Sequence, residues 1–336
     1  MTEVGALSEL RQDILTGEWV IFAGNRKKRP YDFIKKSVPK TTGTEDCQFC
    51  PGNERFTTDA VYQDGENGKW SIREFPNKYP AVSGKVTDED AGGDGFYTSF
   101  RGNGAHEVIV DTPDHFETIQ DFDAGHLFRV LKVLRARYEN ILSRDGIKYV
   151  QIFKNCGPDA GASIMHSHWQ IIGVPVVPEE QTKTAGTLKS HRIKTGECLI
   201  CSVLRHEREI GIRIVGENSR FTALSPYASR MSYECDIIAK EHISRFSEFD
   251  DRALFDLARL LREVLSAVRT LRKEICFNLC FEDTPKGRDG HWFMRVLPRM
   301  GNLAGFEYGT HSYINPVLPE DAAEYMRKII SQNSRG

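Results

Sequence analysis

The residues best suited to chemistry lie in the stretch 155–170, which reads NCGPDAGASIMHSHWQ. Two histidines, His166 and His168, stand one residue apart, and Gln170 follows at the same spacing. Side chains at positions i and i+2 of a strand point to the same face of a sheet. We therefore expect both imidazoles and the amide to line one surface, provided that the segment is extended.

A glycine-rich loop precedes these histidines. A β-type run, 147–153, leads into Gly157, Pro158 and Gly161, a pattern that predicts strand, tight loop and strand. Small residues between 157 and 163 allow backbone N–H groups to approach an anion closely. The combination indicates chemistry on a phosphate group.

A His-x-His pair also has a structural interpretation, because such histidines occur as hydrogen-bonded polar groups on half-buried strands. The adjoining glycine loop and the following glutamine favour the functional interpretation here. The stretch moreover resembles the active-site signature of the galactose-1-phosphate uridylyltransferase family, a branch of the histidine-triad superfamily. The residues that carry this resemblance are Asn155, Gly157, Gly161, Ser163, His166, His168 and Gln170.

The resemblance implies a nucleotidyltransferase with a covalent intermediate on His168. Gln170 and the amides of the loop would hold the phosphoryl oxygens, where charge changes during transfer. A nearby backbone carbonyl would fix the tautomer of His168 that leaves its other ring nitrogen free to attack. The resemblance also assigns nucleotide or substrate binding to Arg26, Arg29, Asn77, Asn155, Gly161 and Ser163.

Four of the eight cysteines form two Cys-x-x-Cys pairs, Cys47/Cys50 and Cys198/Cys201. Each pair is typical of half a metal site that awaits distant ligands. A redox motif is the alternative, although the surrounding residues do not resemble a thioredoxin-type strand-to-helix turn. The remaining cysteines, 156, 235, 276 and 280, are interpreted as small core residues.

The resemblance completes both sites as structural zinc sites with four protein ligands each. The first set is Cys47, Cys50, His115 and His166, and the second is Cys198, Cys201, His242 and His291. Counting back from Pro175 and Pro298 places His291 opposite His168 and Asp289 opposite His166. Asp289 is therefore an alternative to His291 as the fourth ligand of the second site.

The chain is expected to adopt an α+β fold of two histidine-triad-like units in tandem, each an antiparallel sheet with a packed amphipathic helix. Leucines and other apolar residues recur at helical spacing in 127–141 and again in 254–271, and Asp121 or Asp123 is placed to cap the first helix. Segments 198–201, 221–227 and 234–242 repeat the plan of 47–50, 72–79 and 107–115. We expect domains at 1–180, with the nucleophile, and at 190–336. Residues 83–104 are expected to form an irregular loop.

Composition restricts the functional classes. The 336 residues are 40% hydrophobic and 27% charged with a formal net charge of −2, which is ordinary for a globular protein and unlike a dedicated nucleic-acid binder. The sequence shows neither a signal peptide nor a long apolar run, so we expect a cytoplasmic protein without a membrane partner. The resemblance implies a homodimer.

Three functions compete. The first is exchange of a nucleoside monophosphate between a nucleotide sugar and a hexose-1-phosphate, as in UDP-glucose–hexose-1-phosphate uridylyltransferases of galactose metabolism. A variant of this first function is also open. The segments 305–310 and 313–316 look more like ADP-glucose phosphorylase relatives, which use phosphate as acceptor. In addition, no glutamine lies between Gly305 and Ser331. The second function is a histidine-triad hydrolase, which is disfavoured because Gln170 stands in place of a third histidine. The third is a nucleotide-binding module without catalysis.

Overall fold

The computed structural model describes residues 8–23, 43–65, 69–87 and 91–333. Arg26 and Arg29, predicted to bind phosphate, lie outside these residues. Among the described helices, none is long and apolar enough to span a membrane.

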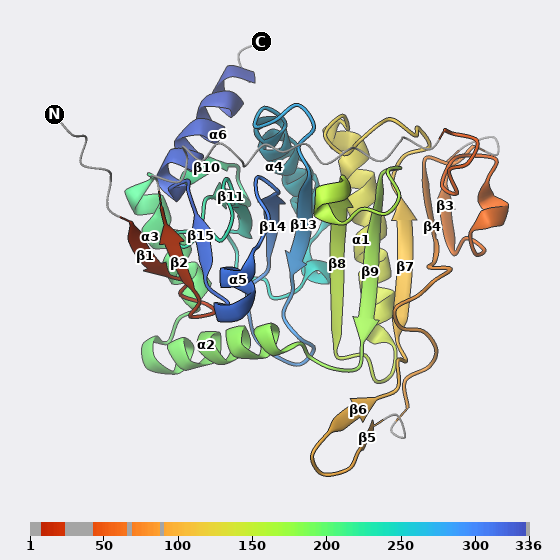
Figure 1. Ribbon diagram of the computed structural model, residues 1–336, viewed down its shortest axis with the longest axis horizontal. Coiled ribbons are helices and arrows are strands. Elements are labelled where there is room, and N and C mark those ends of the chain that lie inside the picture. Colours follow the sequence, from red (N-terminus) through yellow and green to blue (C-terminus); the bar gives the residue numbers. More distant parts are fainter. Residues whose placement is uncertain (1–7, 24–42, 66–68, 88–90, 334–336) are drawn as a thin grey trace.

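The centre of the molecule is a ten-stranded antiparallel sheet (Figure 1). Its strand order is β10-β11-β12-β14-β13-β8-β9-β7-β4-β3. One half holds β3 (Tyr62–Asp64), β4 (Ile72–Pro76), β7 (Ala105–Val110), β9 (His168–Val174) and β8 (Tyr149–Cys156). The other half holds β10 (Ile214–Glu217), β11 (Phe221–Leu224), β12 (Cys235–Ala239), β14 (Phe293–Pro298) and β13 (Phe277–Glu282). Both halves connect their five strands in the same order, and β8 pairs with β13 where they meet.

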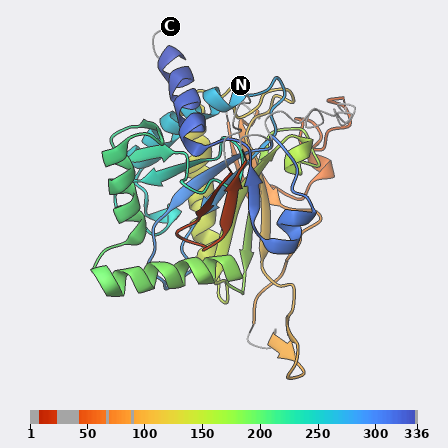
Figure 2. The ribbon, with the colours of Figure 1, turned by 60° about the vertical axis from the view of Figure 1, so that its left-hand side comes forward.

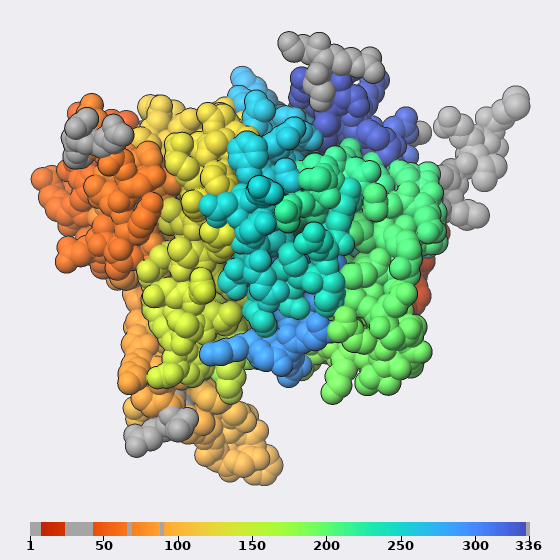
Figure 3. Space-filling model, turned by 180° about the vertical axis from the view of Figure 1, so that it is seen from behind, coloured from red at the N-terminus to blue at the C-terminus, as the bar shows by residue number. Residues whose placement is uncertain are grey.

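Two long helices cover one face of this sheet, side by side in the view from behind (Figure 3). They are α1 (Ala124–Ser143) and α4 (Asp251–Arg269). Asp123 and Asp250 cap their N-termini, each accepting a hydrogen bond from the backbone N–H three residues later. Their apolar stripes pack with Trp169, Phe281 and Trp292 in one core that runs through both halves. The predicted helices and their apolar faces are confirmed.

Smaller elements lie on the opposite face, which α1 and α4 leave uncovered (Figures 1 and 2). A three-stranded sheet contains β1 (Glu9–Gln12), β2 (Trp19–Phe22) and β15 (Tyr313–Asn315), with α5 (Gly305–Thr310) next to it. Helices α2 (Glu179–Thr195) and α3 (Leu199–Ile210) connect the two halves of the large sheet, and α6 (Pro319–Asn333) packs on α4.

The segment 83–104, expected to be an irregular loop, contains a hairpin instead. Strands β5 (Ala91–Gly93) and β6 (Thr98–Phe100) pair and project away from the main sheet (Figure 2). Every residue of this hairpin is exposed, so no apolar alternation marks these strands in the sequence.

Candidate active site

His168 opens strand β9, and His166 lies just before it. The Nδ1 atom of His168 is 2.8 Å from the backbone oxygen of His166. Because a carbonyl oxygen only accepts, Nδ1 carries the proton and Nε2 keeps its lone pair. Burial lowers the pKa of His168 to about 4, so the ring is neutral at pH 7. Phe49 packs edge-on against this ring at 5.1 Å between centroids.

Gln170 is oriented by a histidine that sequence reasoning did not assign to the site. His106 accepts a hydrogen bond at Nδ1 from the backbone N–H of Ala81 (3.0 Å), so its Nε2 carries the proton. That N–H donates to Gln170 Oε1 at 2.9 Å. Asn77 lies beside the same ring, with Nδ2 at 3.2 Å from Nε2. The Gln170 amide N–H groups therefore remain available to a ligand oxygen.

The glycine loop follows β8 as predicted. Gly157 and Gly161 have φ of 83° and 85°, with the short 3₁₀ helix Pro158–Ala160 between them. Asn278 from β13 ties the loop down, donating from Nδ2 to Asn155 Oδ1 and to the backbone oxygen of Ala160, both at 2.8 Å.

Asn155 keeps its own amide N–H groups for a ligand, and Gly161 and Ser163 are exposed at the outer end of the loop. Asn278 was not predicted, because no motif around it in the sequence indicates contact with a loop more than 100 residues away.

The first predicted set of metal ligands comes together. Cys47, Cys50, His115 and His166 are all buried, and their ligand atoms lie within 4.8 Å of one another. Sulfur-to-Nδ1 distances are 3.3–3.6 Å. A tetrahedral zinc with ordinary Zn–S and Zn–N bonds requires about 3.6 Å between such ligands. His166 also donates from Nε2 to the backbone oxygen of Thr112 at 2.8 Å, which orients the ring with Nδ1 toward the sulfurs.

The second set, Cys198, Cys201, His242 and His291, also converges. Sulfur-to-Nδ1 distances are 3.4–3.8 Å, and His291 donates from Nε2 to the backbone oxygen of Ala239 at 2.7 Å. Asp289 is not among the converging groups. Its carboxylate lies 3.0 Å from Nε2 of His242, the ring nitrogen that does not face the cysteines, and so orients the His242 ring. The structure therefore favours His291 over Asp289.

The predicted correspondence between the halves is wrong by two residues. His168 pairs with Val110 at the start of β9, and Phe293 pairs with Ile238 at the start of β14. The count from the prolines fails because Pro298 lies inside β14, whereas Pro175 follows the end of β9. His291 thus corresponds to His166, and Phe293 occupies the position that corresponds to His168.

A buried lysine behind the histidine pair was also missed. Lys154 is 1% exposed, and its ammonium lies 2.7 Å from Asp111 Oδ2 and 2.8 Å from the hydroxyl of Ser167, the residue between the two histidines. The available signal was that Lys154 is the single charged residue of its strand, because a buried ammonium requires a partner.

Comparison with known proteins shows the family of this chain. Residues 1–178 match the family model for the N-terminal domain of galactose-1-phosphate uridyl transferase. The chain belongs to the galactose-1-phosphate uridylyltransferase family. Within that family, it is 33% identical over 333 residues to ADP-glucose phosphorylase from Arabidopsis thaliana, covering 96% of this chain and 93% of the relative. It is 28% identical to galactose-1-phosphate uridylyltransferase from Thermotoga maritima, covering 96% and 98%.

A solved structure supports the same membership in this family. The crystal structure of the Arabidopsis thaliana ADP-glucose phosphorylase with bound ADP-glucose matches with a TM-score of 0.82 and 31% identity, covering 96% of this chain and 99% of that one. The relatives from Arabidopsis and Thermotoga are both enzymes that transfer nucleotidyl groups. The chain is accordingly a nucleotidyltransferase of α+β fold with a large antiparallel sheet.

Proposed function

We propose that this family member transfers a nucleoside monophosphate from a nucleotide sugar to a phosphate-bearing acceptor through a covalent nucleotidyl-His168. The observation that carries the proposal is the hydrogen bond from His168 Nδ1 to the carbonyl of His166, which leaves Nε2 unprotonated. A buried, neutral imidazole held in one tautomer is a competent nucleophile toward phosphorus.

In the first step, the Nε2 lone pair forms a bond to the α-phosphorus, and the bond to the sugar-1-phosphate oxygen breaks. The ring becomes a cation, and the His166 carbonyl stabilises it through Nδ1–H. In the second step, an acceptor oxygen attacks the same phosphorus, and the N–P bond returns its electron pair to Nε2. Gln170 N–H groups and the amides of the 157–163 loop donate to the non-bridging oxygens in both steps.

The metals have a structural role in this proposal. Each cluster supplies four protein ligands at separations that suit tetrahedral zinc, which leaves no open position for substrate. The first ion would join the Cys47–Cys50 turn to His166, and thereby hold Phe49 against His168. Both ions would act on catalysis by positioning residues only.

The nucleoside distinguishes two candidate activities. Uridylyl transfer between hexose-1-phosphates is the activity for which the family model is named. Adenylyl transfer from ADP-glucose to phosphate is favoured by the higher identity to the Arabidopsis phosphorylase, 33% against 28% for the Thermotoga uridylyltransferase. The resemblance to uridylyltransferases implies a glutamine that contacts the hexose between Gly305 and Ser331, and its absence here supports the phosphorylase branch.

The test is a half reaction. Enzyme mixed with ADP-glucose or UDP-glucose alone should release sugar-1-phosphate and retain an acid-labile nucleotidyl group, and intact mass then identifies the base. Discharge of an adenylyl group by inorganic phosphate supports the phosphorylase, and discharge of a uridylyl group by galactose-1-phosphate supports the uridylyltransferase. A panel of nucleotide sugars that turns over without leaving an adduct on His168 would refute the covalent mechanism.

We further propose that the two halves, 1–180 and 190–336, arose by tandem duplication, which the equal strand order of the two half-sheets supports. A cytoplasmic homodimer that uses nucleotide sugars and either hexose-1-phosphate or phosphate is the form we expect to function. The family resemblance supports the dimer, and gel filtration with light scattering tests it.

A further inference from the structure

The second half of the sheet contains a pocket at the place that corresponds to the active site of the first half. The cross-strand pairing matches Phe293 to His168, Arg295 to Gln170 and Asp236 to Val108. Leu224 of β11 occupies the position of Phe75 in β4. An apolar ring in place of the nucleophile removes the covalent chemistry. A pocket with a volume of about 410 Å³ lies at this position.

The walls of this pocket are mainly apolar. They come from the sheet, from α3 and from the turn after β1, and include Leu15, Val203, Leu224, Ile238 and Phe293. A hexose needs many hydrogen bonds, which such walls do not supply. The volume and the apolar lining suit a flat organic ring system.

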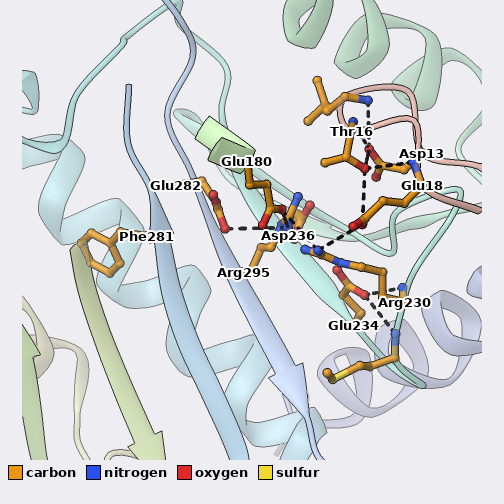
Figure 4. A network of polar contacts seen from close by, with 12 residues as sticks. Asp13, Thr16, Glu18, Glu180, Arg230, Glu234, Asp236, Phe281, Glu282 and Arg295 are labelled. Atoms are coloured by element: carbon orange, nitrogen blue, oxygen red, sulfur yellow. Dashed lines mark hydrogen bonds and ion pairs between the residues drawn. The ribbon is translucent and has the colours of Figure 1, made fainter. Parts of the chain in front are cut away.

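Two buried side chains of the pocket each leave one polar atom without a hydrogen bond. Arg295 is 5% exposed and Asp236 is 7% exposed, yet neither Arg295 Nε nor Asp236 Oδ1 has a hydrogen-bond partner. The two atoms are 3.8 Å apart, which is too long for a hydrogen bond. Figure 4 shows them side by side, with Glu180 and Glu282 next to the guanidinium. Unsatisfied buried groups that line a hollow are suited to a ligand that completes them.

Two further charged side chains of the pocket, Arg213 and Glu207, are already paired. Arg213 forms hydrogen bonds to Glu207 at 2.9 Å and to Glu320 at 2.8 Å. The lining therefore has no excess of positive charge. Asp13 and Glu180 add negative charge near Arg295, and Arg230 pairs with Glu180 at 3.3 Å. A phosphate site usually offers several unpaired arginine or lysine groups, which this lining does not, so the pocket fits a phosphate poorly.

We propose that this pocket binds a neutral nitrogen heterocycle, a purine base or its nucleoside, with Asp236 and Arg295 contacting the ring edge. Burial and neighbouring carboxylates raise the pKa of Asp236 well above its usual value. A protonated carboxyl both donates and accepts, as the N1 and N6 edge of adenine requires. The apolar walls would cover the two ring faces. The comparison with the first half assumes the proposed nucleotide site there, but the pocket and its unsatisfied groups do not depend on that function.

The probe is adenosine, which has no phosphate and cannot label His168. Calorimetry on the metal-loaded full-length protein should detect binding, and Val203→Trp, which fills the pocket from α3, should weaken it about tenfold or more. Leu15→Trp fills the same pocket from the turn after β1 and replaces Val203→Trp in the experiment if that variant does not fold. Thermal melting and metal content show whether each variant folds. Both folded variants should retain nucleotidyl labelling of His168, because neither residue belongs to the active site.

Competition separates the two sites. With the His168→Ala variant saturated by the nucleotide sugar that labels the wild type, adenosine should still bind. Displacement by the nucleotide sugar, equal affinity in the filled variants, or no binding up to about 5 mM adenosine would each overturn the proposal. Adenosine binding without any labelling of His168 would refute the proposed function and leave this inference standing.

Discussion

His166 and His168 are two residues apart, yet their rings are held in opposite ways. His168 donates a hydrogen bond from Nδ1 to a backbone carbonyl. His166 instead donates from Nε2 to a backbone carbonyl, and its Nδ1 faces two cysteines. The difference depends on the partners that the fold supplies to each ring, because both residues are chemically identical. One imidazole is thereby suited to attack and the other to bind metal.

Substitution at the two positions should therefore have separable effects. His168→Ala should abolish nucleotidyl labelling while the melting temperature and zinc content stay close to wild type, because a nucleophile lowers the barrier. His166→Ala should lose about one zinc per chain and melt at lower temperature. Equal zinc content and equal melting in the two variants would contradict this division of roles.

Lys154 provides a second test at the residue scale. Lys154→Met leaves Asp111 buried and charged without its partner, so we expect the free energy of unfolding to fall by about 3–5 kcal/mol. The double variant Lys154→Met/Asp111→Asn removes both charges and should recover part of that loss. Urea unfolding measures both values, and a double variant no more stable than the single one would show that the charge pair is not the cause.

The elements that carry the site are ordinary strands joined by an unusual loop. Gly157 stands at φ 83°, and a Cβ built there would lie 2.4 Å from the sulfur of Cys276. Cys276 precedes β13, so the loop of the first half packs directly on the second half. The shape of the glycine loop therefore depends on residues from both halves.

Gly157→Ala should lower the free energy of unfolding by about 1–3 kcal/mol and slow labelling, because both the contact and the backbone conformation resist a Cβ. Gly186→Ala is the matched control, since Gly186 lies within α2 with open space around it, and alanine there should stabilise by about 0.5–1 kcal/mol. Adding Cys276→Ala to Gly157→Ala removes the contact with the sulfur and keeps the backbone strain, so the difference in stability between the two variants gives the effect of the contact. Wild-type stability of Gly157→Ala would rule out both effects.

The end of β13 carries a pH-dependent contribution to stability. Burial raises the pKa of Asp283 to about 7, against an ordinary value of about 4 in the unfolded chain. The folded state then holds a proton that the unfolded chain releases, so stability present below about pH 4 is lost as pH rises through 7.

Asp283→Asn is uncharged and keeps an oxygen to accept from the N–H of Phe246, now at 2.8 Å. Its stability relative to wild type should rise between pH 5 and about 8. Thermal melts across that range measure the difference, and parallel pH profiles would mean that Asp283 is ionised in the folded protein.

At the scale of the whole molecule, the two Cys/His clusters that could hold metal differ in access to solvent. The first has four buried ligands, whereas His242 is exposed and Cys201 is partly exposed in the second. Each cluster ties a Cys-x-x-Cys segment to the large sheet. Loss of either ion should therefore reduce stability as well as activity.

We expect a chelator to remove zinc in two phases, the second cluster first, because exposed ligands exchange more readily. Zinc release followed with a chromogenic chelator should show about one fast and one slow ion per chain. Cys201→Ser should eliminate the fast phase and leave the slow one. If that substitution eliminated the slow phase instead, the second cluster would be the slower site. Purified protein without metal would refute both metal sites.

Local sequence was sufficient for much of the fold and the site. Leucine spacing predicted α1 and α4, the 147–153 run and the glycines predicted β8 and its loop, and the short spacings within Cys-x-x-Cys and His-x-His identified chemically active segments. These features depend on residues within one or two turns of each other, so periodicity and backbone preference reveal them. The resemblance to a family supplied the distant histidines that join each cysteine pair.

The tertiary structure alone determined the partners. His106 behind Gln170, Asn278 under the loop and Lys154 behind Ser167 reach the site from other strands. The register of β14 placed His291 rather than Asp289 beside Cys198 and Cys201. A shift of two residues in a strand keeps every side chain on the same face, so the alternating pattern is unchanged and cannot fix the register. Hydrogen bonds between strands distant in sequence fixed it here.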